Sequence, residues 1–533
     1  MNMTELIGEE FKDWGYEEAH TIFLGAPTGA GKTFFILNKL LPYIREKGEK
    51  LKIFVPRITL LQKYEEDIQE YAIKHFISLF EIGEIVSVDT YQALEERMKK
   101  GKEENFANYV VFDECHYWLS DSIFNTNTIF SYSYAINREN SRIRIFISAT
   151  GERIFQKIII DNNLRDIAMR TVVKTTYTEF KKYTMQKEKK FFIHYYDERI
   201  SKAAIITKNI SKKWVVFVNS IEEGVKLKEE LLKNDIYAIF INRKNKDEEA
   251  STFYDISAME QFRGKVLITT AVVETGINFR EDVGNIIIES NFAEQFIQML
   301  GRKRLNEGEI VELYLPCRSE RYFRNLLEGI SKILEQYSEI ISNTENKVLE
   351  MMLKEKIDFS IVKKFLYIQG NSFQINSLSI EEVIYQKVVL KKRIKELEKD
   401  SYAFIKEQLN WINMEESFCK KNMLRENLRE NAISCFKEEV LKMYLEKKVM
   451  NKEELIKYLM DLIPLVIDIG KDYIIKENFS VKSFNKLCKD IIFPYHIVTS
   501  NKNNSRRTHY WLEEIISETL ENQELEEDNG EID

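Results

Sequence analysis

The chain has 533 residues, of which 44% are hydrophobic, 12% aromatic and 31% charged, so collagen-like, disordered and mini-protein classes are excluded and three or four domains are expected. Its formal net charge is −8, but residues 513–533 contain ten acids and no Lys or Arg, which leaves +2 for the rest. We interpret residues 513–533 as an acidic disordered tail that keeps the chain soluble, so the net charge does not exclude nucleic-acid binding.

The cysteines and apolar segments indicate a cytoplasmic protein without a membrane partner. The five cysteines are widely spaced and include no C-x-x-C pair, which argues against a disulfide framework and against a zinc site. The first fifteen residues are acidic and lack the apolar run of a signal peptide. The most apolar segment, Tyr458–Ile475, is interrupted by Asp461, Asp468 and Lys471, so no membrane-spanning helix is predicted.

Residues 1–155 are predicted to form a first α/β domain. Short apolar runs rich in β-branched and aromatic residues alternate there with helical segments, which is typical of a doubly wound parallel sheet. The predicted strands are His20–Leu24, Lys52–Val55, Ile85–Val88, Tyr109–Phe112 and Ile143–Ile147.

The segment between the first predicted strand and the first predicted helix, APTGAGKT, has the pattern of a phosphate-binding loop. Its glycines let backbone N–H groups wrap the phosphates, and the helix N-terminus attracts the anion. We expect Lys32 to reach the β- and γ-phosphates and Thr33 to ligate Mg²⁺. The residues predicted to bind the nucleotide here are Ala26, Pro27, Thr28, Gly29, Ala30, Gly31, Lys32 and Thr33.

Two adjacent acids, Asp113 and Glu114, follow the strand Tyr109–Phe112. The end of that strand lies at the carboxyl edge of a parallel sheet, beside the phosphate loop. Asp113 is predicted to hold Mg²⁺, and Glu114 is predicted to orient or deprotonate the attacking water. An apolar run before two acids is common, but about 80 residues after a phosphate loop it is a specific signal.

A second α/β domain is predicted over residues 156–325. A segment near residues 152–185 joins it to the first domain. Its predicted strands are Trp214–Val218, Ala238–Ile241, Lys265–Thr269, Asn285–Glu289 and Ile310–Leu315.

Residues 326–512 are predicted to form a mostly helical accessory domain. Only Gly370 and Gly470 occur between residues 331 and 529, so few helix breakers interrupt this region. Ser379 and Glu382 have the spacing of a capping box, which predicts the start of an amphipathic helix there.

The end of the accessory domain has a different pattern. A helix is predicted over Val481–Lys489, followed by strands over Phe493–Thr499 and Arg506–Trp511. Basic and aromatic residues alternate there, which suggests a winged-helix-like element that contacts nucleic acid. The favoured interpretation is nevertheless a plain structural cap, because a run of charges usually lies on a solvated face.

The order of these motifs resembles that of helicase superfamily two. After the phosphate loop and Asp-Glu-Cys-His, the strand Ile143–Ile147 leads into Ser-Ala-Thr at residues 148–150, an order similar to that of the DEAD/DEAH-box NTPases. The resemblance covers roughly residues 20–320. It implies two tandem RecA-like parallel-sheet domains, with ATP and Mg²⁺ as cofactors.

Further residues take their predicted roles from this resemblance. It implies that His116, Ser148 and Thr150 couple hydrolysis to movement of the domains. The residues that it implies for binding nucleic-acid backbone are Arg57 of VPR, Thr90 of DTYQ, Ser220 of FVNS, and Thr269 and Thr270 of TTAVVETGINF. Those that it implies for the nucleotide cleft are Gly276, Asn278 and Arg302. It implies that Gln298 couples the lobes, and that Gln298 and Arg302 have catalytic roles.

Three features depart from the family pattern. The motif that ends G-R-x-x-R in the family has Leu305 in the place of the last arginine, so we expect Arg302 to be the main arginine finger, at the start of a helix. No glutamine precedes the phosphate loop, so the glutamine that reads adenine in DEAD-box proteins is absent. Residues 280–297 leave room for a strand and a helix but little room for a strand-separating hairpin.

These residues predict an ATP-dependent helicase or translocase that binds the backbone of single-stranded or partly duplex DNA or RNA. One alternative is the motor subunit of a nuclease, restriction or phage-defence complex, with a protein partner bound through the C-terminal region. A second alternative is a non-catalytic clamp with a helicase fold. The intact catalytic set of Lys32, Asp113, Glu114 and Arg302 argues against the clamp, and Leu305 keeps it open.

Overall fold

The computed structural model describes residues 3–14, 20–26, 29–102, 104–169, 191–197, 200–242, 261–270, 279, 283–303, 309–341, 364–369, 372–447, 449–470, 473–474, 479–500 and 509–514. The chain divides into two compact units, one of Met1–Ile193 with Glu198–Phe418 and one of His194–Asp197 with Cys419–Asp533. All five cysteines are free.

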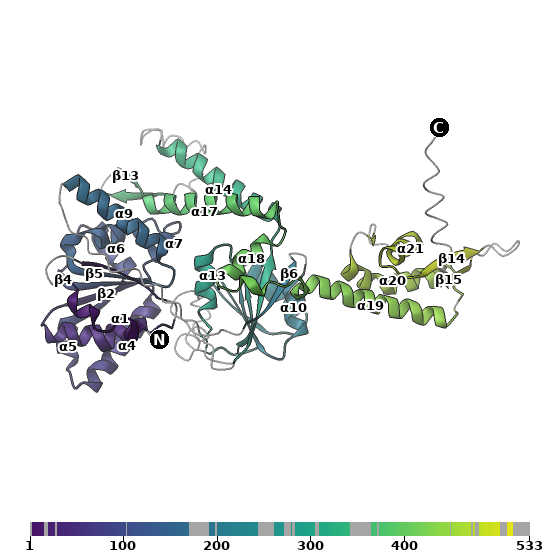
Figure 1. Ribbon diagram of the computed structural model, residues 1–533, viewed down its shortest axis with the longest axis horizontal. Helices are drawn as coiled ribbons and strands as arrows, with labels where there is room; N and C mark the ends of the chain where they lie inside the picture. Colours follow the sequence, from purple (N-terminus) through teal and green to yellow (C-terminus); the bar gives the residue numbers. More distant parts are fainter. Residues whose placement is uncertain are drawn as a thin grey trace. The chain divides into compact units, whose positions relative to one another are not determined.

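The first predicted sheet is present in the first unit, and its five strands lie where the apolar runs predict them (Figure 1). They are β1 (His20–Gly25), β2 (Leu51–Val55), β3 (Val86–Thr90), β4 (Ala107–Asp113) and β5 (Ser141–Ser148). Neighbours pair in parallel in the order β1-β5-β4-β2-β3, so their carboxyl ends share one edge. We call this sheet and its helices the first lobe; the helices are α1 (Met3–Ile7), α2 (Lys32–Phe35), α3 (Leu41–Glu46), α4 (Ile58–Lys74), α5 (Leu79–Ile85), α6 (Tyr91–Lys99), α7 (Tyr117–Ser120), α8 (Thr128–Ile136) and α9 (Glu152–Met169).

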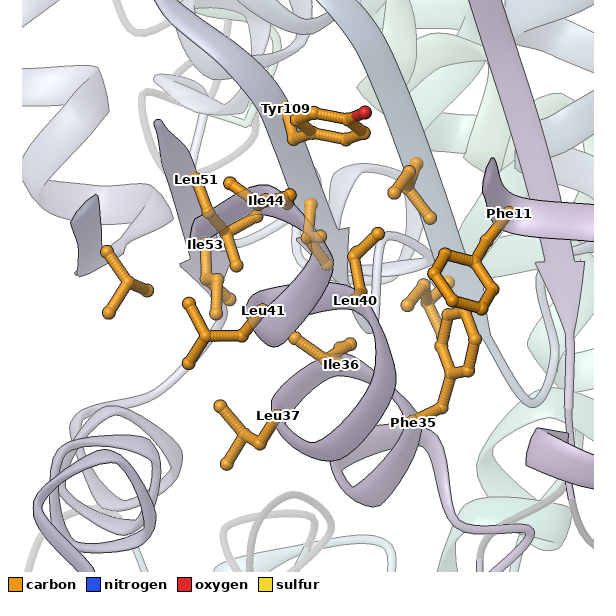
Figure 2. Close-up of a cluster of buried hydrophobic side chains, with 14 of the residues drawn as sticks. Phe11, Phe35, Ile36, Leu37, Leu40, Leu41, Ile44, Leu51, Ile53 and Tyr109 are labelled. Atoms are coloured by element: carbon orange, nitrogen blue, oxygen red, sulfur yellow. The ribbon is translucent and has the colours of Figure 1, made fainter. Parts of the chain in front are cut away.

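One long helical segment follows β1 and packs on the first sheet. Helix α2, a π-helical turn over Ile36–Leu40 and α3 follow one another without a break. Figure 2 shows the apolar side of this segment against the sheet; the labelled side chains are Phe11, Phe35, Ile36, Leu37, Leu40, Leu41, Ile44, Leu51, Ile53 and Tyr109, all of them buried. Because the segment begins at Lys32, its packing fixes the position of the phosphate loop.

The second predicted sheet has six strands rather than the five expected. They are β6 (Phe191–Asp197), β7 (Lys213–Phe217), β8 (Ala238–Ile241), β9 (Val266–Thr269), β10 (Val283–Ile288) and β11 (Val311–Cys317), in the order β6-β11-β10-β7-β9-β8. Strands β7 to β11 pair in parallel and match the predicted runs, whereas β6 was not predicted. We call this sheet the second lobe, together with its helices α10 (Lys202–Lys208), α11 (Ile221–Leu232) and α13 (Ala293–Leu300).

The chain leaves the second sheet through α14 (Glu320–Ile341), and the predicted domain boundary at residue 326 falls inside this helix. The first unit continues to Phe418. Its remaining elements are the hairpin of β12 (Leu366–Gln369) and β13 (Ser372–Ile375) and the helices α17 (Ser377–Leu397) and α18 (Ala403–Asn410). The region poor in glycine is therefore mostly helical, as predicted, and α14 lies alongside α17 (Figure 1).

The capping box predicted at Ser379 and Glu382 is wrong. Helix α17 begins at Ser377, and Asn376 caps it by accepting a hydrogen bond from the Leu378 N–H. The Ser379 hydroxyl donates to the Ser122 carbonyl at 2.8 Å, and Glu382 pairs with an arginine of α9. Both side chains bind the first lobe instead. Their spacing of three residues is the same as that of a capping box, which is why the sequence suggested one.

The second unit contains the predicted C-terminal helix and hairpin. Its helices are α19 (Leu424–Leu445), α20 (Lys452–Ile469) and α21 (Val481–Asp490), followed by the antiparallel strands β14 (Tyr495–Ser500) and β15 (His509–Glu514). Glu513 and Glu514 pair with His496 and Tyr495 in this hairpin, so the predicted tail begins two residues too early at 513. Residues 515–533 lie outside the described residues.

The apolar segment Tyr458–Ile475 coincides largely with the C-terminal part of α20. Apolar side chains of α20 and α19 share one buried core, which explains why this segment is hydrophobic. Among the helices of the described ranges, none combines the length and the apolar character that crossing a membrane requires.

We predict that Leu40→Ala destabilises the first lobe, because this side chain is fully buried between the long helical segment and the sheet. The expected loss is about 2–5 kcal/mol in the free energy of unfolding. Urea unfolding followed by tryptophan fluorescence measures it. The control is Ile73→Ala on α4, whose side chain is 72% exposed and should change stability by less than about 0.5 kcal/mol. Equal effects of the two substitutions would contradict the packing described here.

Candidate functional site

The phosphate loop begins where β1 ends. Gly29 and Gly31 both have a φ of 85°, in the left-handed region that side chains rarely enter, so the turn of the loop requires glycine at these positions. The Ala26 N–H donates to the Ser148 carbonyl at 3.1 Å. This bond ties the loop to the end of β5 just before the helix starts at Lys32.

Lys32 and Glu114 form a buried ion pair between the ends of β1 and β4. Their Nζ and Oε1 atoms are 2.6 Å apart, and each side chain is 10% exposed. Burial raises the pKa of Glu114, but the Lys32 ammonium and the His116 ring together outweigh it and hold the pKa well below its usual range. Burial lowers the pKa of Lys32, and the two acids more than offset this, so both groups stay charged. Glu114 adopts a left-handed φ of 50°, a strained conformation of the kind that clusters at functional sites.

Asp113 is held by two buried tyrosines. The Tyr64 hydroxyl of α4 donates to Asp113 Oδ2 at 2.9 Å, and the Tyr91 hydroxyl of α6 donates to the Asp113 carbonyl at 2.9 Å. The Tyr64 hydroxyl also hydrogen-bonds the side chain of Thr33. Burial raises the pKa of Asp113 to about 6, although Lys32 acts against it. The two oxygens predicted to ligate Mg²⁺, on Thr33 and Asp113, therefore lie on either side of one hydroxyl.

A chain of hydrogen bonds starts beside Glu114 and runs through the Ser-Ala-Thr segment. His116 Nδ1 lies 3.4 Å from Glu114 Oε2 and shares a hydrogen bond of 3.0 Å with Ser148 Oγ. The Thr150 N–H donates to the same Ser148 oxygen at 3.1 Å. These contacts link the ends of β4 and β5 within the first lobe.

The same chain continues into the second lobe. Gln298, near the end of α13, donates from Nε2 to Thr150 Oγ1 at 3.4 Å, and Arg302 donates from Nη2 to Gln298 Oε1 at 2.9 Å. Arg302 is 5% exposed and lies close enough to Lys32 to lower the pKa of that lysine. The site thus brings together Lys32 of the first lobe and Arg302 of the second.

The expectation that Arg302 lies at the start of a helix is wrong. Helix α13 ends at Leu300, and Arg302 lies in the turn that follows. The reason is a backbone contact, because the Phe279 N–H donates to the Arg302 carbonyl at 2.8 Å and Phe279 forms a β-bridge with Lys303. Arg304 and Leu305 lie outside the described residues.

The residues predicted to bind nucleic acid form one group on each lobe, with Arg57 and Thr90 on the first and Ser220, Thr269 and Thr270 on the second. Thr90 ends β3 beside Val55, the last residue of β2, and Arg57 follows Val55 by two residues. The buried hydroxyl of Thr90 caps α6. The Arg57 guanidinium pairs with Asp121 at 2.8 Å. On the second lobe, the exposed Ser220 caps α11. Both groups lie at the carboxyl ends of strands. Thr90 is the last residue of β3, and Thr269 is the last residue of β9.

Other predicted residues contribute less direct information. The Thr269 hydroxyl is fully buried and donates to the Thr270 carbonyl at 3.0 Å, so it presents no free face to a ligand. Ala30 is buried, and its carbonyl accepts a hydrogen bond of 2.8 Å from the Met3 N–H. The predicted nucleotide-binding residues that lie outside the described residues are Pro27, Thr28, Gly276 and Asn278.

The first lobe matches a known family model. Residues 2–153 match the family model described as Type III restriction enzyme, res subunit. This range contains the phosphate loop, the Asp-Glu-Cys-His segment and the Ser-Ala-Thr segment in the predicted order. Over these residues the chain is similar to that family. Among the curated proteins, none matches the sequence.

The chain is also similar to solved structures at low identity. S. cerevisiae Dbp5 bound to RNA and ADP BeF3 is 15% identical, with a TM-score of 0.38 over 56% of this chain and 79% of that chain. Mycobacterium smegmatis helicase Lhr bound to ssDNA and AMP-PNP is 16% identical, with a TM-score of 0.38 over 56% of this chain and 44% of that chain.

Two residues of the site were missed by sequence reasoning. Tyr64 lies in α4, two turns after Arg57, and a tyrosine on the buried side of a helix needs a partner for its hydroxyl. Arg153 lies three residues after Thr150 and contacts the second lobe. The sequence signal for Tyr64 was its position on the apolar face of α4. The signal for Arg153 was its position in the first turn of a helix, where a positive charge is unfavourable unless it has an acidic partner.

We predict that Tyr64→Phe weakens the use of Mg²⁺ in NTP hydrolysis, because the lost hydroxyl orients the Asp113 carboxylate and contacts Thr33. Loss of such a supporting hydrogen bond typically costs 10–100-fold in metal affinity, so the Mg²⁺ concentration for half-maximal rate should rise about tenfold. Titration of hydrolysis with Mg²⁺ measures this. Tyr71→Phe on the same helix is the control and should leave the titration unchanged. An unchanged titration for Tyr64→Phe would remove this role.

Proposed function

We propose that the chain is an ATP-dependent, DEAD/DEAH-box-like helicase or translocase that steps along nucleic-acid backbone. The observation that carries this proposal is the continuous set of contacts from Lys32 through Glu114, His116, Ser148, Thr150 and Gln298 to Arg302. It joins a phosphate loop on one parallel sheet to an arginine on another. A nucleotide bound between them would contact both lobes, so its binding and hydrolysis would change the distance between the lobes.

The donors around Asp113 fit Mg²⁺. A carboxylate and a hydroxyl are the hard oxygen ligands that this ion prefers, and Tyr64 keeps those of Asp113 and Thr33 together. The chemistry that Mg²⁺ supplies in such a site is neutralisation of charge on the phosphate oxygens. Thr33 and Asp113 would hold it, while Tyr64 and Tyr91 fix the orientation of Asp113.

The Lys32–Glu114 pair would make nucleotide binding precede activation of the attacking water. The ammonium of Lys32 now lies against the carboxylate of Glu114 at 2.6 Å, and a bound triphosphate offers that ammonium a stronger anion. When Lys32 turns to the phosphates, Glu114 is released to accept a hydrogen bond from water. Glu114 then orients or deprotonates the attacking water, and Arg302 stabilises charge that develops on the transferred phosphoryl group.

Coupling to nucleic acid follows from the two pairs at the strand ends. Arg57 and Thr90 belong to the first lobe, and Ser220 and Thr270 belong to the second. If each pair binds backbone, then closing and opening the nucleotide site changes the distance between the two contacts, and the protein advances along single-stranded or partly duplex DNA or RNA. Contacts to phosphate and sugar carry little sequence preference.

A second candidate function is the motor of a restriction or phage-defence nuclease. The match of residues 2–153 to a family described as Type III restriction enzyme, res subunit, favours it. Within the described ranges, no group of three or more His, Cys, Asp or Glu side chains could hold a metal ion for such a nuclease. Cleavage of DNA only after a partner protein is added would support this function over an independent helicase.

We predict that Lys32→Ala and Glu114→Gln each lower ATP turnover at least about 100-fold, because each removes charge stabilisation or water positioning from the transition state. Glu114→Gln should still bind ATP. Steady-state hydrolysis with and without single-stranded DNA or RNA measures turnover, and fluorescent-nucleotide titration measures binding. Turnover within a few-fold of wild type for either variant contradicts the site. A wild type that binds nucleic acid without hydrolysis would indicate a clamp.

Binding to single-stranded nucleic acid should weaken with salt. If about four phosphates are neutralised, the plot of log K against log [salt] should have a slope near −3. Fluorescence anisotropy over a salt series measures it. Removing residues 515–533, which leaves β15 intact, should strengthen binding if the acidic tail competes with nucleic acid. An affinity that does not change with salt would contradict binding to the phosphate backbone. If the truncated chain binds with unchanged affinity, the tail serves only to keep the protein soluble.

A further inference from the structure

A second polar junction joins the lobes one helical turn beyond the Ser-Ala-Thr segment. Arg153, in the first turn of α9, donates from Nη1 to both carboxylate oxygens of Glu294 at 3.2 Å. From Nη2 it donates to Glu382 Oε2 at 2.7 Å. Its guanidinium carbon lies 3.4 Å from the centre of the Tyr385 ring. One side chain therefore binds the first turn of α13 in the second lobe and helix α17 at the same time.

This junction depends on its single cation. The side chains of Arg153, Glu294 and Glu382 are 19%, 21% and 8% exposed, and one positive charge faces two acids. Burial raises the pKa of Glu294, even though Arg153 acts against it. Removing one partner of a buried ion pair is costly because the other charge stays buried, so both acids rely on Arg153.

Arg153 has little freedom to move. A Cβ atom on Gly151 would lie 2.4 Å from the Phe155 ring, so the chain passes that ring as closely as glycine allows. The Phe155 ring in turn packs on Phe23 of β1 with centroids 5.0 Å apart. The start of α9 is thus fixed to the first sheet, and α17 holds the guanidinium from the other side through Tyr385 and Glu382.

Glu294 connects this junction to the arginine of the nucleotide site. Glu294 and Gln298 are four residues apart in α13, so they lie on one side of the helix. Gln298 contacts Thr150 and Arg302, whereas Glu294 contacts Arg153. The first lobe therefore holds α13 at two points one turn apart, and Arg302 extends from the end of the helix held in this way.

We propose that Arg153 is a positioning residue that sets the place of Arg302 in the nucleotide site by holding Glu294, with α17 as its support. The proposal rests on the proposed function, since it assigns Arg153 a role in the same reaction. Arg153 does not contact the reacting atoms. Its loss removes one of the two polar contacts described above between α13 and the first lobe. A displacement of about 1 Å in a catalytic group can cost about 100-fold in rate.

The test compares Arg153→Ala with Lys157→Ala. Lys157 lies one turn further along α9 and pairs with Glu381 of α17 at 2.8 Å and with Asp161 of its own helix at 3.2 Å. Its loss removes one contact between α9 and α17 and leaves the pairs of Arg153 with Glu294 and Glu382 in place. We expect Arg153→Ala to lower kcat about 10–100-fold and to leave KM for ATP within about threefold. Lys157→Ala should keep kcat within about twofold, and Arg153→Lys should give an intermediate kcat.

A double-mutant cycle separates positioning from folding. Glu294→Gln keeps the shape of the side chain and should lower kcat as Arg153→Ala does, while the double variant should fall no further, because both changes remove one link. Equal kcat for Arg153→Ala, Glu294→Gln and wild type overturns this proposal and leaves the proposed function standing. An equal fall in Lys157→Ala also overturns it. A wild type without hydrolysis overturns both.

Discussion

The contact between the Lys32 ammonium and the Glu114 carboxylate is the interaction on which the rest of the site depends. Each group is too buried to remain charged alone, so the loop after β1 and the turn after β4 must meet. They meet because β5 lies between β1 and β4 in the first sheet. The same strand order explains the role of Ser148, which ends β5 and is hydrogen-bonded on one side to Ala26 and on the other to His116.

The second lobe enters this arrangement through one helix. Helix α13 meets the first lobe through Gln298 and Glu294, both of which bind side chains from residues 150–153. Polar contacts of this kind can be broken and remade more easily than a continuous apolar core. The helical region after the second sheet adds a further hold, because α17 binds the first lobe at Ser122 and Arg153.

Much of the fold could be predicted from the sequence, because strands and the phosphate loop depend on local patterns. Ten of the eleven large-sheet strands follow apolar runs, and glycine is required at Gly29 and Gly31 by their φ of 85°. Tyr64 and Arg153 could not be found in this way, because their partners lie 49 and 141 residues away in the chain. Ser379 shows the same limit, since its spacing to Glu382 fits a cap whereas both residues serve distant contacts.

The balance of charge around Arg153 has a consequence for how this sequence can vary among relatives. Three separate stretches, at residues 153, 294 and 382, share one cation and two acids in a confined space. Replacing the arginine with a neutral residue in one lineage leaves two acids facing each other, so the change is tolerated best when an acid is lost as well. Substitutions at these three positions should therefore be correlated, and that covariation would be visible between helices α9, α13 and α17 in an alignment of close homologues.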